Sequence, residues 1–169
     1  MRALVEGAER YEVALVASNK PEAAGLAWAR DRGLATWALD SKSLGKEAFD
    51  RTLSAVLDDH RVGTIALAGF MRILSPWFVE EWRGRIVNIH PSLLPKYRGL
   101  DTHARAIEAG DAVSGCSVHV VTEYLDAGEV LGQAEVPIEP GDTPAKLEQR
   151  VLLAEHGLYP RVLNEFICR

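Results

Sequence analysis

The sequence predicts an α/β fold with a mostly parallel sheet in its first half and a mixed sheet in its second half. In the first half, short apolar runs alternate with stretches at helical spacing, which is typical of parallel strands covered by helices on both faces. In the second half, two longer strand-like runs come before one long amphipathic stretch. The first half is therefore expected to be Rossmann-like. The 169 residues contain no linker or repeat, which predicts a single domain spanning residues 1–169.

The first half contains four expected strands and three expected helices. The strands are short apolar runs at residues 13–17, 36–39, 64–68 and 85–89. The helices between them are expected at residues 22–32, 46–60 and 75–82. Pro21 and Pro76 stand near the first turns of the first and third helices, where a missing N–H does no harm. The second helix has one apolar face, formed by Phe49, Leu53, Val56 and Leu57.

The second half is expected to contain two strands, at residues 115–122 and 130–136, joined by the segment 123–129. Thr143 then caps a long helix with Pro144 in its first turn. The buried stripe of this helix is expected to consist of Leu147, Val151, Ala154 and Leu158.

The first ten residues have the composition of a helix interior, and no capping residue comes before them. An α/β domain of this pattern usually opens with a strand and a loop that lead into the first helix. We therefore expect a domain truncated at its N-terminus.

Composition excludes several classes of protein. The net charge of −5 argues against a non-specific nucleic-acid binder, which needs excess cations. No apolar run approaches the ~20 residues that span a bilayer, and the opening residues do not resemble a signal peptide. Two cysteines, Cys116 and Cys168, are too few for a disulfide framework. We expect a soluble cytoplasmic protein.

The chemistry is expected where the fourth strand ends, because ligands of open α/β sheets bind at the carboxyl ends of the strands. Alternation along an extended segment places Asn88 and His90 on the same side. A neutral amide donor and a protonated imidazole aimed at one oxygen are what a developing oxyanion requires. The alternative is that Asn88 caps the following loop and His90 is a structural histidine.

A carboxylate near His90 would favour its cation, and Asp126 is the candidate. It lies in a turn, where Asp is also favoured for local hydrogen bonds, so a purely structural role stays open. His119 is expected to share a sheet face with Ser117. Arg72 could contact an anionic or heterocyclic ligand or simply be solvated. No histidine pair has the helical spacing of a zinc site, so no metal is expected.

Five segments together resemble the phosphoribosylglycinamide (GAR) formyltransferases, which use 10-formyltetrahydrofolate. These segments are residues 68–75 (AGFMRILS), 88–95 (NIHPSLLP), 99–103 (GLDTH), 115–119 (GCSVH) and 125–128 (LDAG). The resemblance runs from the first helix to about Phe166 and implies the formyltransferase fold. It departs from the family at the start, where the family has a strand and a phosphate-binding loop.

The resemblance implies roles for named residues. Asn88, His90 and Asp126 match the catalytic trio that stabilises the tetrahedral intermediate. The residues that would bind folate are Lys46, Met71, Arg72, Ile73, Leu74, Val79, Ile86, Asn88, Val121, Thr122, Glu123, Tyr124, Leu125 and Asp126. The residues that would contact the glycinamide or its ribose are Met71, Ile89, Pro91 and Glu155.

The expected function is transfer of the formyl group of 10-formyltetrahydrofolate to GAR in purine synthesis, by a monomer or homodimer without metal, nucleic acid or membrane. Two alternatives remain. One is a 10-formyltetrahydrofolate deformylase or a formyltransferase for another amine. The other is a truncated folate-binding domain with weak activity.

Overall fold

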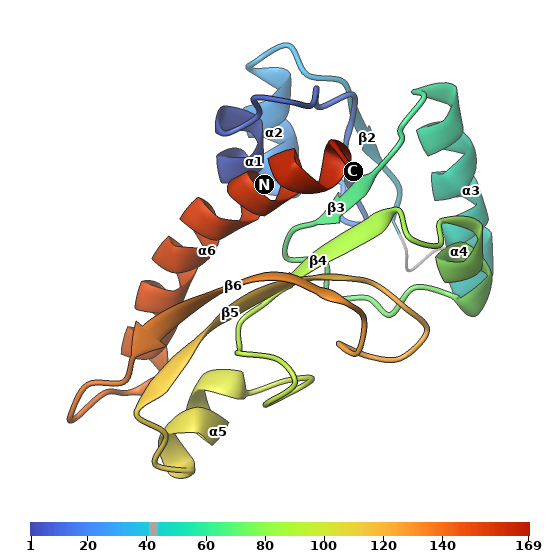
Figure 1. The fold of residues 1–169 in the computed structure, drawn as a ribbon. Coiled ribbons are helices and arrows are strands. Elements are labelled where there is room, and N and C mark those ends of the chain that lie inside the picture. Colours follow the sequence, from blue (N-terminus) through green and yellow to red (C-terminus); the bar gives the residue numbers. More distant parts are fainter. Residues whose placement is uncertain (41–43) are drawn as a thin grey trace.

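The computed structural model describes residues 1–40 and 44–169, which form six helices and six strands (Figure 1). In chain order the elements are α1 (Arg2–Glu6), β1 (Val16–Ser18), α2 (Ala24–Arg30), β2 (Thr36–Ala38), α3 (Lys46–Asp59), β3 (Ile65–Leu67), α4 (Pro76–Glu81), β4 (Ile86–His90), α5 (Thr102–Glu108), β5 (Val113–Val120), β6 (Val130–Pro137) and α6 (Pro144–Ile167).

The strands form a four-stranded sheet in the order β3-β4-β5-β6 and a separate pair, β1-β2. β1 and β2 are parallel, as are β3 and β4, whereas β5 runs antiparallel to both β4 and β6. The predicted change from a parallel first half to a mixed second half is confirmed. The β4–β5 register places Asn88 opposite His119 and His90 opposite Ser117.

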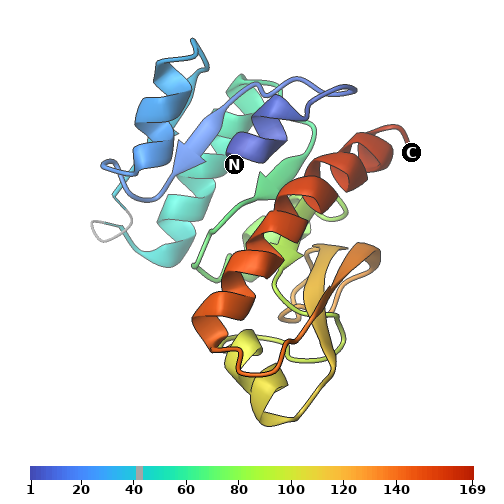
Figure 2. The same ribbon diagram turned by 90° about the vertical axis from the view of Figure 1, so that its left-hand side faces the viewer.

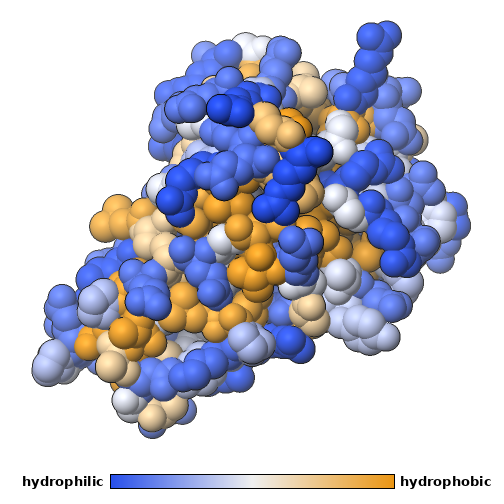
Figure 3. All heavy atoms as spheres, in the orientation of Figure 1, coloured by the Kyte–Doolittle hydropathy of each residue, from blue (hydrophilic) through white to orange (hydrophobic). Residues whose placement is uncertain are grey.

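Helices cover both faces of the four-stranded sheet, as predicted. One face packs against α6, where Val87, Val118 and Leu158 belong to one buried cluster. The other face packs against α3 and α4, where Ile86, Phe49 and Trp82 belong to a second cluster. Figures 1 and 2 show α6 crossing one side of the strands and α3 and α4 lying on the other. Figure 3 shows hydrophobic residues in a band over the region of α6, β4 and β6.

Helix α6 is the longest element, and its Tyr159 contacts both β3 and β4. The side chain of Thr143 caps it by accepting a hydrogen bond from the Lys146 N–H at 3.3 Å, as predicted. Of its predicted stripe, Leu147, Val151 and Leu158 are buried and Ala154 is partly buried. The Tyr159 hydroxyl lies 3.0 Å from the carbonyl of Leu67 in β3 and 2.8 Å from that of Val87 in β4.

Three predicted boundaries near the start were wrong. The helix expected over residues 1–10 is α1, which ends at Glu6, because the side chain of Asn164 takes up the backbone N–H groups of Glu9 and Arg10. Helix α2 begins at Ala24 rather than at residue 22, because a turn closed by the Ala23 N–H and the Lys20 carbonyl comes first. Strand β1 begins at Val16, three residues later than predicted.

An apolar cavity of about 480 Å³ lies between the edges of the two sheets. β1 and β3 are both edge strands within the described residues, and both line this cavity. Phe49, Phe78 and Leu163 close it from the helices. Within the described residues, no backbone ladder joins the β1–β2 pair to the four-stranded sheet.

Candidate active site

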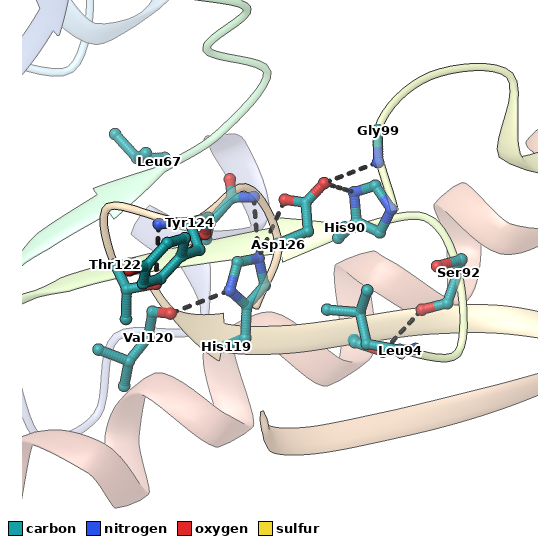
Figure 4. Close-up of polar contacts among 12 residues, drawn as sticks. Leu67, His90, Ser92, Leu94, Gly99, His119, Val120, Thr122, Tyr124 and Asp126 are labelled. Atoms are coloured by element: carbon teal, nitrogen blue, oxygen red, sulfur yellow. Dashed lines mark hydrogen bonds and ion pairs between the residues drawn. The ribbon is translucent and has the colours of Figure 1, made fainter. Parts of the chain in front are cut away.

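Four polar side chains meet where β4 ends (Figure 4). Asn88 and His90 alternate with Ile89 along β4, so they lie on the same face of the sheet. His119 comes from β5, directly opposite Asn88. Asp126 comes from the β5–β6 connection, and its carboxylate lies between the rings of His90 and His119.

His90 is 6% exposed, and both of its ring nitrogens face oxygen acceptors. Nε2 lies 2.9 Å from the main-chain carbonyl oxygen of Tyr97. Nδ1 lies 3.4 Å from Oδ2 of Asp126. Because a carbonyl and a carboxylate can only accept hydrogen bonds, the surroundings fit a ring that carries a proton on each nitrogen. Both ring nitrogens of His90 therefore face groups that can only accept hydrogen bonds.

Asp126 is a carboxylate held in place by several donors. Its backbone φ is 48°, in the left-handed region that Asp tolerates better than most residues. Burial by itself raises the pKa of Asp126, but the nearby His119 ring, a hydrogen bond from the Gly99 N–H and the charge of His90 bring the pKa below its usual value. The Gly99 N–H donates to Oδ2 at 3.0 Å. Asp126 is therefore ionised at neutral pH and can balance the charge of His90.

His119 orients the amide of Asn88. Its Nδ1 lies 3.0 Å from the Val120 carbonyl, so this nitrogen carries a proton. Its Nε2 lies 3.3 Å from Nδ2 of Asn88 and 3.6 Å from Oδ1 of Asp126. The His119 ring is only 2% exposed. The buried His119 ring therefore contacts both Asn88 and Asp126.

The loop after His90 is held against β5 and β6 by a small polar network. Ser117, opposite His90, donates from Oγ to the Ser92 carbonyl at 2.6 Å and accepts from the Leu94 N–H at 3.0 Å. The Gln133 amide of β6 donates to Ser117 Oγ at 2.8 Å and to the Leu94 carbonyl at 3.0 Å. This network fixes the path along which the chain leaves His90.

The connection that carries Asp126 returns closely onto β5. The Val120 N–H donates to the Glu129 carbonyl, and a Cβ at Gly128 would lie 1.8 Å from the Val120 carbonyl oxygen. Only glycine permits that approach. The Val121 N–H also donates to the Ile86 carbonyl, which links the connection to β4. Asp126 is thus carried on a short loop fixed at both ends.

Several residues expected to bind folate have large apolar side chains that are exposed to solvent. Met71 is 80% and Ile73 is 73% exposed after β3, and Tyr124 is 69% and Leu125 is 61% exposed in the β5–β6 connection. Exposed apolar side chains on two neighbouring segments are typical of a surface that takes up a flat hydrophobic ligand.

The other expected folate residues lie in varied surroundings. Arg72 is half-buried, with its Cζ 4.5 Å from the centre of the Phe49 ring. Lys46, Thr122 and Glu123 are exposed, whereas Val79 and Val121 are partly buried against the α3–α4 cluster. Leu74 is 8% exposed and Ile86 has no exposed surface, so both side chains belong to the core of the fold.

The residues expected to contact the acceptor lie on both faces of the sheet. Met71 is exposed and Pro91 half-buried. Ile89 points to the opposite face from Asn88 and His90 and packs against the α6 cluster. Glu155 is half-buried on α6, where burial and the neighbouring Glu148 raise its pKa.

Sequence reasoning gave no catalytic weight to His119 and none at all to the main chain of Tyr97 and Gly99. Alternation along β5 placed His119 on the face of Ser117, and the structure confirms that. Its contact with Asn88 depends on the antiparallel register, which no local pattern encodes.

Three further features of the described residues concern metal sites, membrane-spanning helices and reactive cysteines. They contain no cluster of three metal-ligating side chains. No helix among them is long and apolar enough to cross a membrane. Both cysteines are free, and burial raises the pKa of Cys116 to about 12.

Known proteins match this chain over nearly its whole length. Residues 1–163 match the formyl transferase family. The chain is 49% identical to the phosphoribosylglycinamide formyltransferase of Escherichia coli over 155 residues, which cover 91% of this chain and 73% of that protein. It is 44% identical to the human trifunctional purine biosynthetic protein adenosine-3 but spans only 15% of that protein's length.

Solved structures give the same result. The phosphoribosylglycinamide formyltransferase of Bacillus halodurans superposes with a TM-score of 0.92 at 35% identity, covering 98% of this chain and 88% of that one. The enzyme of Brucella melitensis superposes with a TM-score of 0.90 at 47% identity, covering 97% and 87% of the two chains. With sequence, fold and strand-end geometry in agreement, the chain belongs to the formyl transferase family and, within it, to the phosphoribosylglycinamide formyltransferases.

Proposed function

We propose that this protein transfers the formyl group of 10-formyltetrahydrofolate to the amine of GAR, a step of purine synthesis. The observation that carries the proposal is the convergence of Asn88, His90 and Asp126 at the end of β4, with His90 Nδ1 3.4 Å from Asp126 Oδ2. Family membership supports formyl transfer to GAR over the alternative activities.

Asn88, His90 and Asp126 each contribute to stabilising the charge of the tetrahedral intermediate. When the amine nitrogen attacks the formyl carbon, the carbonyl oxygen becomes an oxyanion. The amide of Asn88 supplies a neutral donor, and the His90 imidazolium supplies positive charge beside that oxygen. Asp126 keeps His90 in its cationic form and balances its charge.

The proton balance follows from the same groups. The attacking amine loses a proton as the new C–N bond forms, and the folate nitrogen gains one as its bond to the formyl carbon breaks. Asp126, ionised and adjacent to both histidines, is placed to relay that proton through water. The products are formyl-GAR and tetrahydrofolate. The amine is itself a competent nucleophile, so the mechanism needs no covalent enzyme intermediate.

The folate would lie against the exposed apolar side chains of Met71, Ile73, Tyr124 and Leu125. Main-chain groups of the β5–β6 connection would supply hydrogen bonds for the edge of its ring. Arg72, Lys46 and the remaining predicted residues border this surface or support it from the core. We place Ile86 and Leu74 among the supporting residues because they are buried.

We propose a cytoplasmic location, because two cysteines are too few for a disulfide framework and a reducing compartment is then the default. The partners proposed are the two small-molecule substrates, bound by a monomer or homodimer.

The test incubates the purified protein with GAR and 10-formyl-5,8-dideazafolate and follows the deformylated folate product and formyl-GAR together. Equal amounts of both products support the proposal. Formate release without GAR would instead identify a deformylase. Thermal stabilisation by the folate without turnover in either reaction would identify a binding domain.

A further inference from the structure

Tyr97 is held at both of its ends, and the two ends lie at different sites. Its hydroxyl donates to Oδ2 of Asp111 at 2.9 Å. Its main-chain carbonyl accepts from Nε2 of His90 at 2.9 Å. Its φ of 54° lies in the left-handed region, which a tyrosine rarely adopts unless its surroundings hold it there. Tyr97 therefore connects Asp111 to His90 through a single residue.

The Asp111 end of this connection is an ion-pair network outside the site. Lys96 Nζ lies 3.0 and 2.9 Å from the two carboxylate oxygens of Asp111. Hydrogen bonds from Lys96 and then from Tyr97 lower the pKa of Asp111, so it is ionised at neutral pH. Arg105 of α5 lies 5.2 Å from the centre of the Tyr97 ring and donates to the carbonyls of Arg98 and Leu100.

The His90 end of the connection serves two residues of the catalytic trio. The Tyr97 carbonyl accepts from His90, and two residues later the Gly99 N–H donates to Oδ2 of Asp126 at 3.0 Å. One short stretch of main chain thus supplies an acceptor to the cation and a donor to the anion. Its placement decides whether both groups are held in their charged forms.

We propose that Asp111 is a positioning residue for the reaction, which through the Tyr97 side chain fixes the 97–99 main chain against His90 and Asp126. It touches neither substrate nor the reacting atoms. The effect on rate rests on the proposed function, whereas the placement of the main chain does not.

The charged and titratable groups around His90, Asp126 and Tyr97 determine how the pKa of Asp126 responds when the Tyr97–Asp111 hydrogen bond is lost. His90 is faced by Asp126 and has His103 of α5 nearby, and Asp126 is also faced by His119. Tyr97 is faced by Asp111, Lys96 and Arg105. If the 97–99 main chain moves, Asp126 loses the Gly99 donor while its burial, which raises the pKa, remains. The acidic limb of the pH–rate profile then moves towards neutral pH.

The experiment compares Tyr97→Phe, Asp111→Ala and Asp111→Asn with the parent protein. For the first two we expect kcat at pH 7 to fall about tenfold and the acidic limb of kcat to rise by about one pH unit, a tenfold change in proton affinity. KM for both substrates changes little. Asp111→Asn recovers part of the rate, because its amide oxygen still accepts from Tyr97. The double variant Tyr97→Phe/Asp111→Ala is no slower than either single variant, because both break the same connection.

A second readout is independent of activity. Hydrogen exchange of the Gly99 amide, followed by NMR without substrates, should be accelerated in Tyr97→Phe and Asp111→Ala. The matched control is Glu80→Gln, which removes the exposed ion pair between Glu80 of α4 and Arg83 and should alter neither readout. Unchanged Gly99 exchange, or an acidic limb that stays in place, overturns the proposal. If exchange accelerates as expected but the parent protein transfers no formyl group, the failure lies with the proposed function instead.

Discussion

Asn88 and His119 face each other across the β4–β5 pair, with the amide Nδ2 of Asn88 3.3 Å from Nε2 of His119. Because Nδ1 of His119 lies 3.0 Å from the Val120 carbonyl and carries the proton there, Nε2 is free to accept from Asn88. The direction of the Asn88 amide is thereby set by a residue of the neighbouring strand. In the proposed mechanism, the second N–H of that amide donates to the oxygen of the reacting carbonyl.

Replacing His119 with alanine is expected to lower kcat while KM for the folate changes little. The partly buried amide of Asn88 loses its acceptor, at a cost in stability below the ~1–3 kcal/mol of an unsatisfied fully buried group. Steady-state kinetics and urea unfolding measure the two effects. His119→Gln restores an acceptor oxygen and should recover part of the rate. An unchanged kcat in His119→Ala would show that Asn88 needs no such support.

Replacing His90 with alanine is expected to lower kcat by ~10²–10⁴, the range for loss of a general acid–base group. Folate affinity should change little, because His90 is buried and acts on the transition state. Single-turnover kinetics and equilibrium binding of a folate analogue separate these quantities. A kcat near that of the parent protein would remove His90 from the mechanism.

Replacing Arg72 with alanine is expected to weaken folate binding more than GAR binding. Arg72 stacks over Phe49 between the exposed Met71 and Ile73, the surface proposed for the folate. The matched control is Arg85→Ala, an arginine that also stacks on an aromatic ring, that of Trp82 at 4.2 Å, but lies before β4 and away from the site. Titration with each substrate gives the ranking, and the reverse order would overturn the assignment of this surface.

The stability of the protein is expected to fall below about pH 4 partly through Asp142. A hydrogen bond from Arg150, and a second from the Glu139 N–H, lower the pKa of Asp142 to about 2. A carboxyl with a lowered pKa contributes stability that is complete above its unfolded value of about 3.9 and is lost as the pH falls through its folded value. Between pH 4 and pH 2, the Asp142→Asn variant should therefore lose less stability than the parent protein. Urea unfolding of both proteins at several pH values across this range gives the free energy of unfolding as a function of pH. The same dependence on pH in both proteins would refute the assignment.

The sequence predicted the elements well where one periodicity dominates. The stripe of Leu147, Val151 and Leu158, with the Thr143 cap, gave α6 its start and its buried face. The predictions were weaker where a side chain from far away decides the outcome. Asn164 ends the first helix by bonding to Glu9 and Arg10, some 155 residues distant, and no local pattern encodes that contact.

The same distinction holds at the candidate site. Alternation placed Asn88 and His90 on one face, but it also placed Ile86 there, and only the packing of α3 and α4 shows that this end of the face is covered. Local preference explained Asp126 as a turn residue, and its approach to His90 depends on the return of the chain at Gly128. The contribution of Tyr97 comes from its main chain, which carries no residue-specific signal.

The cavity between β1 and β3 has a consequence for how the molecule responds to temperature. No ladder of backbone bonds among the described residues joins the β1–β2 pair to the larger sheet, and apolar side chains such as Trp37 of β2 attach the pair by packing against the α3–α4 cluster. Hydrophobic attachment weakens on cooling. Chilling is therefore expected to loosen this attachment first, so that in the cold the amide hydrogens of the β1–β2 pair exchange before those of the four-stranded sheet.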